Sequence, residues 1–105
     1  MSRVRIDQLL KLLGAEPDDH FCLYGLGLEH SRLGEGIEAR RWFDRAILVR
    51  PDEAYAYYHK AKSLIDDGLR DEALLVLNAG FLAAKRSGDT KAMSEIASLR
   101  DEIDE

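Results

Sequence analysis

Apolar side chains recur every three or four residues along almost the whole chain, which is the periodicity of an α-helix. Glycine, proline and acidic residues interrupt the pattern at 14–17, 34–36, 51, 68 and 87–89. Such residues end one helix or cap the next. The sequence therefore predicts an all-α chain of six helices. Asp71 is expected in the opening turn of the fifth helix. The N-cap candidates of other helices are Ser2, Asp18 or Asp19, Asp52 or Glu53, and Asp89 or Thr90.

A pattern of apolar and small residues between Leu23 and Pro51 returns, in a degraded copy, 34 residues later. Pro17 and Pro51 are separated by the same interval. A period of this length is typical of stacked supersecondary units, none of which can bury its apolar face alone. We therefore expect a single domain over 1–105, composed of an N-terminal helix (3–14), a first helical hairpin (20–53), a second hairpin (54–87) and a capping helix (89–104).

This pattern resembles the signature of the tetratricopeptide repeat (TPR) family, in which Trp, Leu, Gly, Tyr, Ala, Phe, Ala and Pro occupy fixed positions. The first unit has the family's residues at Leu26, Gly27, Ala39, Phe43, Ala46 and Pro51, with Leu23 and His30 in place of aromatic residues. The second unit fits at Tyr57, Ala61, Leu64, Ala73 and Leu77 and departs at Lys60, Gly80 and Lys85. The resemblance implies a right-handed α-solenoid of antiparallel helix hairpins, of the small bacterial stand-alone type. Two TPR units would lie between an N-terminal half-repeat helix and a C-terminal capping helix. A two-residue insertion would precede the capping helix.

Small residues in both units indicate close helix packing, with Gly27 and Ala61 on the first helices facing Ala39 and Ala73 on the second. Function in such an array comes from the side chains that the first helix of each pair turns toward the concave surface. The expected groove residues are Phe21, Tyr24, Gly25, Leu28, Arg32, Tyr55, Tyr58, His59, Lys62 and Ile65. A tyrosine-rich groove suits a peptide or helix of another protein. The alternative is that a terminal helix or a second copy covers these residues.

Some TPR proteins hold the C-terminal carboxylate of chaperones with a clamp of Lys, Asn and Arg. The matching positions here are Phe21, Gly25, Tyr55 and His59, so the resemblance does not extend to that clamp. Arg32 and Lys62, with His59 as a third, are the expected groove cations. They indicate a weak preference for an acidic or amphipathic ligand.

Catalytic and metal-binding motifs are missing from the sequence. His20, His30 and His59 are far apart in the repeat frame and have no metal-ligand spacing, so His30 is interpreted as a packing residue and His20 as part of a helix start. The single cysteine, Cys22, cannot form an intramolecular disulfide and is interpreted as a buried structural thiol. We expect no enzyme activity, no metal and no cofactor.

Polar and charged residues interrupt the apolar residues at the start of the sequence, so it lacks a secretory core and we expect a cytoplasmic protein. The net charge of −5 argues against nucleic acid, and no apolar run is long enough to span a membrane. Three arginines, Arg40, Arg41 and Arg45, alternate with Glu38 and Asp44 at spacings of three and four residues, which is typical of a solvated, ion-paired helix face. Trp42 lies beside the core stripe and is expected to be half exposed.

Together these features predict a non-catalytic interaction module that binds a peptide or helix of a partner protein in its groove. The alternative is a structural homo-oligomer that associates weakly through the groove or through an open end of the solenoid.

Overall fold

The computed structural model describes residues 3–104, which form six helices and no β-strand. They are α1 (Arg3–Ala15), α2 (His20–Arg32), α3 (Gly36–Val49), α4 (Ala54–Asp66), α5 (Arg70–Ser87) and α6 (Thr90–Ile103). The prediction of an all-α chain is confirmed, while the cap predicted at Ser2 lies outside the described residues. None of the described helices is long and apolar enough to cross a membrane.

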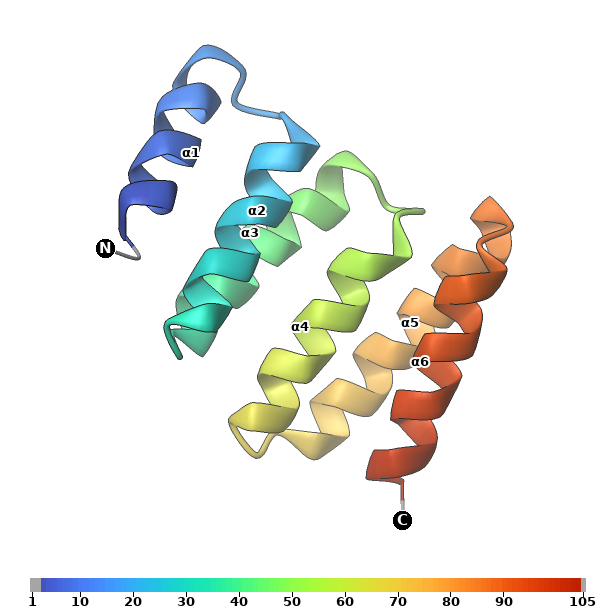
Figure 1. The fold of residues 1–105 in the computed structure, drawn as a ribbon. Helices are drawn as coiled ribbons and strands as arrows, with labels where there is room; N and C mark the ends of the chain where they lie inside the picture. The colour runs from blue at the N-terminus through green and yellow to red at the C-terminus, as the bar shows by residue number, and fades with distance from the viewer. Residues whose placement is uncertain (1–2, 105) are drawn as a thin grey trace.

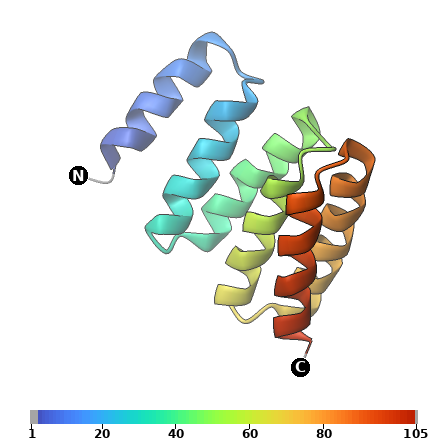
Figure 2. The same ribbon diagram turned by 45° about the vertical axis from the view of Figure 1, so that its right-hand side comes forward.

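The helices form antiparallel hairpins that stack side by side (Figures 1 and 2). α2 pairs with α3 and α4 pairs with α5, while contacts between α3 and α4 join the two hairpins. In Figure 1, α2, α4 and α6 form the layer nearer the viewer, and α3 and α5 lie behind them. Within residues 3–104, α1 packs on α2 and on no other helix, whereas α6 packs on both α5 and α4. The arrangement is the helical-hairpin solenoid that the sequence predicts.

Acidic side chains cap the N-termini of α2, α4 and α6. Each accepts a hydrogen bond from a backbone N–H of the first turn, at 3.2 Å for Asp19, 2.8 Å for Glu53 and 3.0 Å for Asp89. These bonds satisfy amides that have no partner inside the helix. The structure thus selects one residue from each pair of cap candidates. α5 has no side-chain cap, because Leu69 precedes it and Asp71 lies in its first turn.

At one pair of corresponding positions, the two hairpins carry side chains of different sizes that fill the same space between the two helices. In the first hairpin Gly27 faces Phe43 so closely that a Cβ atom on the glycine would lie 2.4 Å from the ring. In the second hairpin the corresponding residues are Ala61 and Leu77. All four are buried. A larger residue on one helix is therefore accompanied by a smaller residue on the other, as close packing requires.

A second exchange of this kind explains why Gly80 departs from the alanine of the TPR pattern. A Cβ atom at Gly80 would lie 2.7 Å from the Cβ of Tyr57. In the first hairpin the corresponding pair is Ala46 and Leu23, which has a smaller side chain in place of the tyrosine. The glycine accommodates the aromatic residue that the second hairpin carries at this site.

The prediction that the arginines of α3 form a solvated face is wrong for Arg40. Its side chain is 14% exposed, and it donates hydrogen bonds to Ser63 Oγ at 2.9 Å and to Asp67 Oδ2 at 2.8 Å. Arg40 faces α4 of the next hairpin, and spacing within α3 alone does not reveal that neighbour. Arg41 follows the prediction, since it is 72% exposed and lies 3.8 Å from Glu38.

Candidate functional site

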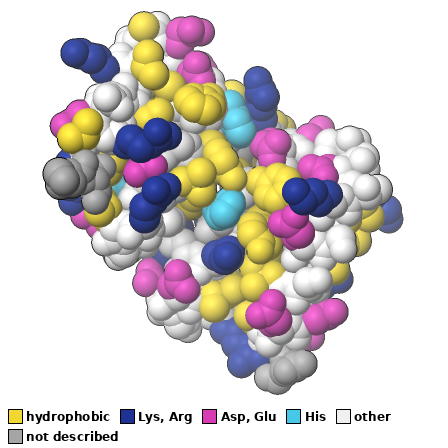
Figure 3. All heavy atoms as spheres, in the orientation of Figure 1, with side chains coloured by type: hydrophobic (Ala, Val, Ile, Leu, Met, Phe, Trp, Pro, Cys, Tyr) yellow, Lys and Arg dark blue, Asp and Glu magenta, His cyan; other side chains and the backbone are white. Residues whose placement is uncertain are grey.

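The layer of α2, α4 and α6 presents aromatic side chains on one face, which we call the aromatic face. It is formed by half-buried Tyr24, Tyr55, Tyr58 and His59, with Phe21 exposed at its border. Figure 3 shows the hydrophobic and histidine side chains gathered across the middle of this face, with charged groups around them. All five residues belong to the groove predicted from the sequence, and the structure brings them together.

The rings form a continuous row from α2 to α4. The centroids of Tyr24 and His59 lie 5.7 Å apart, those of His59 and Tyr58 lie 5.3 Å apart, and those of Tyr58 and Tyr55 lie 6.1 Å apart. The buried ring of Phe43 lies beneath, 6.2 Å from His59. Each of these three surface pairs is edge-to-face, a geometry that holds aromatic side chains in defined orientations.

Neither terminal helix lies across the aromatic face. α1 packs beside α2, and α6 continues the layer next to α4. Phe21 remains 67% exposed, and Leu28 and Ile65 are half-buried. Gly25 differs from the expectation that it lines the groove, because its Cα faces α1: a Cβ atom there would lie 3.2 Å from Leu9 Cδ1.

The predicted groove cations are partly engaged. Arg32 lies 3.2 Å from Glu29, whose buried carboxylate also pairs with Arg5 at 3.0 Å. Lys62 is exposed, with its ammonium 5.4 Å from the centroid of the Tyr58 ring. Of the two, Lys62 is therefore the more available to a ligand.

Sequence reasoning missed a contribution from α6. The hydroxyl of Tyr55 donates a hydrogen bond to Glu95 Oε1 at 3.2 Å, which links α4 to α6 across the face. When α6 is aligned with the first helix of each hairpin by the two-residue shift, Glu95 falls at the position of Gly25. That alignment was the one signal for Glu95, and it does not reveal the bond to Tyr55.

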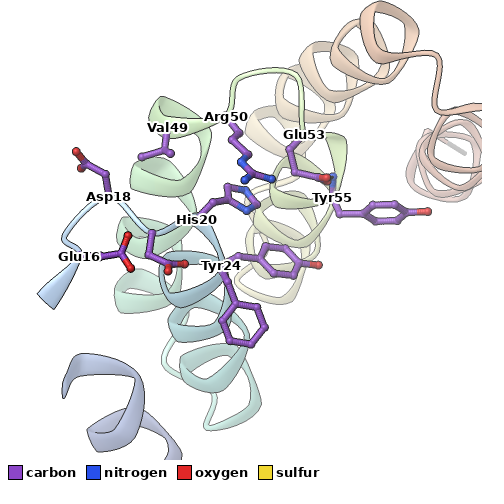
Figure 4. Close-up of a pocket in the computed structure, with 10 residues that line it drawn as sticks. Glu16, Asp18, His20, Tyr24, Val49, Arg50, Glu53 and Tyr55 are labelled. Atoms are coloured by element: carbon purple, nitrogen blue, oxygen red, sulfur yellow. The ribbon is translucent and has the colours of Figure 1, made fainter. Parts of the chain in front are cut away.

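A pocket of about 580 Å³ opens at the end of the aromatic face where α2 and α4 begin (Figure 4). Phe21, Tyr24 and Tyr55 contribute its aromatic walls. The other lining residues are mostly charged, and sequence reasoning did not assign them to a site: Glu16, Asp18, Asp19, His20, Arg50 and Glu53. They come from the loop before α2, the first residue of α2 and the loop between α3 and α4, which lie at the same edge of the layer.

Burial controls protonation on this face. Desolvation, followed by the nearby Glu53 carboxylate, raises the pKa of Tyr24 to about 12. Desolvation also lowers the pKa of His59, and the neighbouring Lys62 acts in the same direction. The pKa of His20 is lowered by burial and then by Arg50. At neutral pH the phenol of Tyr24 and the imidazoles of His59 and His20 are therefore uncharged.

Residues considered for other roles lie away from this face or are buried. Cys22 is buried, and burial raises the pKa of its thiol. His30 is also buried, and its Nδ1 lies 2.7 Å from Glu35 Oε1. Trp42 is half-buried on α3 as expected, with the Arg45 guanidinium 5.0 Å from its ring centroid. Within the described residues, no group of three or more His, Cys, Asp and Glu side chains could hold a metal ion.

Comparison with known proteins identifies the fold. A scan against models of protein families and a search among curated proteins found no match. Among solved structures, the TPR2B domain of yeast Sti1, in its complex with pHsp70, has a TM-score of 0.88 at 20% identity, covering 94% of this chain and 79% of that one. PcrH, in complex with the chaperone-binding region of PopD, has a TM-score of 0.84 at 17% identity, covering 90% and 72%.

The Yersinia enterocolitica type III secretion translocator chaperone SycD has a TM-score of 0.83 at 18% identity, covering 91% of this chain and 67% of that one. Identities of this size establish the fold alone. The chain has a TPR-type fold, which confirms the resemblance seen in its repeat pattern.

Proposed function

We propose that this protein is a non-catalytic interaction module that binds an extended or helical segment of a partner protein on its aromatic face. The observation that carries this proposal is the row of edge-to-face rings from Tyr24 to Tyr55, which no helix of residues 3–104 covers. Two of the similar structures, those of Sti1 and PcrH, are complexes with a partner chain, which supports a protein ligand for this fold.

The aromatic face has the properties of a binding surface that is organised before the ligand arrives. Tyrosine rings offer a large apolar area at a small cost in side-chain entropy, and their hydroxyls give direction to the contact. Tyr55 is already oriented by its bond to Glu95, so little order must be gained on binding. Residues of this type contribute most of the affinity at protein interfaces.

A photo-crosslinking experiment tests this assignment. A benzophenone amino acid replaces Phe21, which is 67% exposed on the aromatic face, or Leu48 of α3, which is 81% exposed. We expect irradiation in cells to capture one recurrent partner through position 21 and not through position 48. The affinity of that purified partner is then measured for the unmodified chain and for Tyr58→Ala.

Tyr58→Ala should weaken the affinity about tenfold or more, whereas Leu48→Ala should leave it unchanged. Circular dichroism verifies that both variants fold. Equal affinities for the Tyr58 variant and the unmodified chain would refute binding on this face, as would crosslinks that come only from position 48.

A structural homo-oligomer is the second candidate, because α1 exposes apolar side chains at Val4, Leu10 and Leu12. Sedimentation at several concentrations separates the two functions. A strict monomer at high concentration would remove the oligomer, whereas a tight dimer that protects Phe21 from crosslinking would remove the open aromatic face.

A further inference from the structure

The pocket at the start of α2 and α4 carries an excess of negative charge. Four carboxylates line it, from Glu16, Asp18, Asp19 and Glu53, against the single guanidinium of Arg50. Figure 4 shows Glu16 and Asp18 on one side of the pocket, with Glu53 and Arg50 on the other. His20 lies between them and is neutral at pH 7, because burial and Arg50 lower its pKa.

Each of these carboxylates keeps at least one oxygen available to a ligand. Asp19 and Glu53 each use one oxygen to cap a helix, which leaves the second oxygen of each carboxylate for a ligand. Among residues 3–104, Glu16 and Asp18 form no ion pair. The start of each helix carries a partial positive charge that would attract an anion. Here the acidic side chains oppose that attraction.

The walls of the pocket suit a long cationic side chain. Phe21, Tyr24 and Tyr55 supply ring faces and edges, against which the methylene groups of a lysine or arginine pack and over which its charge is attracted. At the same wall, the Nε2 atom of His20 is buried and has no hydrogen-bond partner within the described residues.

We propose that this pocket binds a lysine or arginine side chain of the partner segment that lies on the aromatic face. The proposal rests on the proposed function and names the chemistry of its ligand. Lys62, seven residues beyond Tyr55 on α4, lies roughly 10 Å further along the same helix and bears the opposite charge. The segment therefore carries a basic residue toward the pocket and acidic or polar residues toward Lys62, which sets its direction on the face.

Selection from a library of random twelve-residue peptides displayed on phage tests the pocket. Peptides enriched on the unmodified chain are synthesised with a fluorescent label, and their affinities are measured by anisotropy. The test variant is Glu16→Gln/Asp18→Asn, which removes two carboxylates that cap no helix. The control variant, Asp101→Asn/Asp104→Asn, changes the net charge equally at the end of α6. A further variant, Tyr58→Ala, reports on the aromatic face outside the pocket, because Tyr58 does not line it.

We expect the enriched peptides to share one lysine or arginine. Replacing it with uncharged norleucine should weaken binding to the unmodified chain and to the control variant about tenfold, and binding to the test variant less than about threefold. Peptides that lose affinity for Tyr58→Ala but share no basic residue, or share a carboxylate instead, would overturn the pocket proposal and leave the proposed function standing. If no peptide depends on Tyr58, the proposed function fails, and the pocket proposal fails with it.

Discussion

The contact between Gly27 and Phe43 yields a prediction whose sign depends on two opposing effects. Replacing a glycine with alanine inside a helix stabilises the helix by about 1 kcal/mol. The new methyl group of Gly27→Ala, however, would lie 2.4, 2.5 and 2.8 Å from three atoms of the Phe43 ring. That ring is fully buried, so overpacking costs roughly 2–3 kcal/mol. We expect a net destabilisation of about 1–2 kcal/mol.

The second hairpin suggests the remedy, because it carries alanine and leucine at the corresponding positions. Phe43→Leu alone should cost about 1–2 kcal/mol for the apolar volume it removes. In the double variant, the alanine methyl occupies part of the space that the ring leaves. The two losses should therefore not add, and the coupling energy should be about 2 kcal/mol in favour of the pair.

Urea denaturation, followed by circular dichroism and by the fluorescence of the single tryptophan, measures all four members of this cycle. The matched control is Gly14→Ala in α1, where an added Cβ would have nothing within 4 Å. It should be neutral or stabilise the chain by up to about 1 kcal/mol. If Gly27→Ala stabilises the protein as Gly14→Ala does, or if the double variant shows additive losses, the reasoning from close packing is refuted.

Three further predictions concern the packing between helices, pH and a turn. Arg40→Met should lower the free energy of unfolding by about 2 kcal/mol because it leaves Asp67 and Ser63 without their donor, whereas Arg41→Met should change it by less than about 0.5 kcal/mol; urea titrations compare them. Because the folded chain lowers the pKa of His59, the unfolded chain binds more protons below about pH 6.5, so stability should fall between pH 7.5 and 5.5. His59→Gln should make urea midpoints less dependent on pH, and an unchanged dependence would contradict this account. Gly88→Ala should cost about 1 kcal/mol in thermal melts, since the glycine ends α5 with φ at +71°.

The period of the sequence made the architecture predictable. Ala39 recurs as Ala73 and Pro17 as Pro51, each 34 residues later, because each hairpin must present the same packing face to its neighbour. The same repetition predicted which side chains of α2 and α4 would share a face, including Tyr24 and Tyr58. Periodicity reports which way a side chain points, although Gly25, which was assigned to the same face, lies against α1.

Contacts between side chains of different repeats were not predictable in this way. Arg40 matched an exposed stripe in its own helix, yet its partners come from α4 and its C-cap residue, more than twenty residues later. The charged pocket likewise joins Glu16 and Glu53, which belong to two different loops. Such arrangements depend on the distance between loops at one edge of the stack, and a one-dimensional pattern does not contain that distance.

The position of α1 at the end of the stack has a consequence for the reactivity of the protein. A helix with one neighbour has the fewest contacts to break, so in an array of nearest-neighbour contacts it should open before the hairpins unfold. Cys22 shares a buried cluster with Ile6, Leu9 and Leu13 of α1, and that helix shields it from solvent. The thiol thus acts as a built-in reporter: the rate at which an alkylating reagent labels it under native conditions measures how often the first helix lifts from the solenoid.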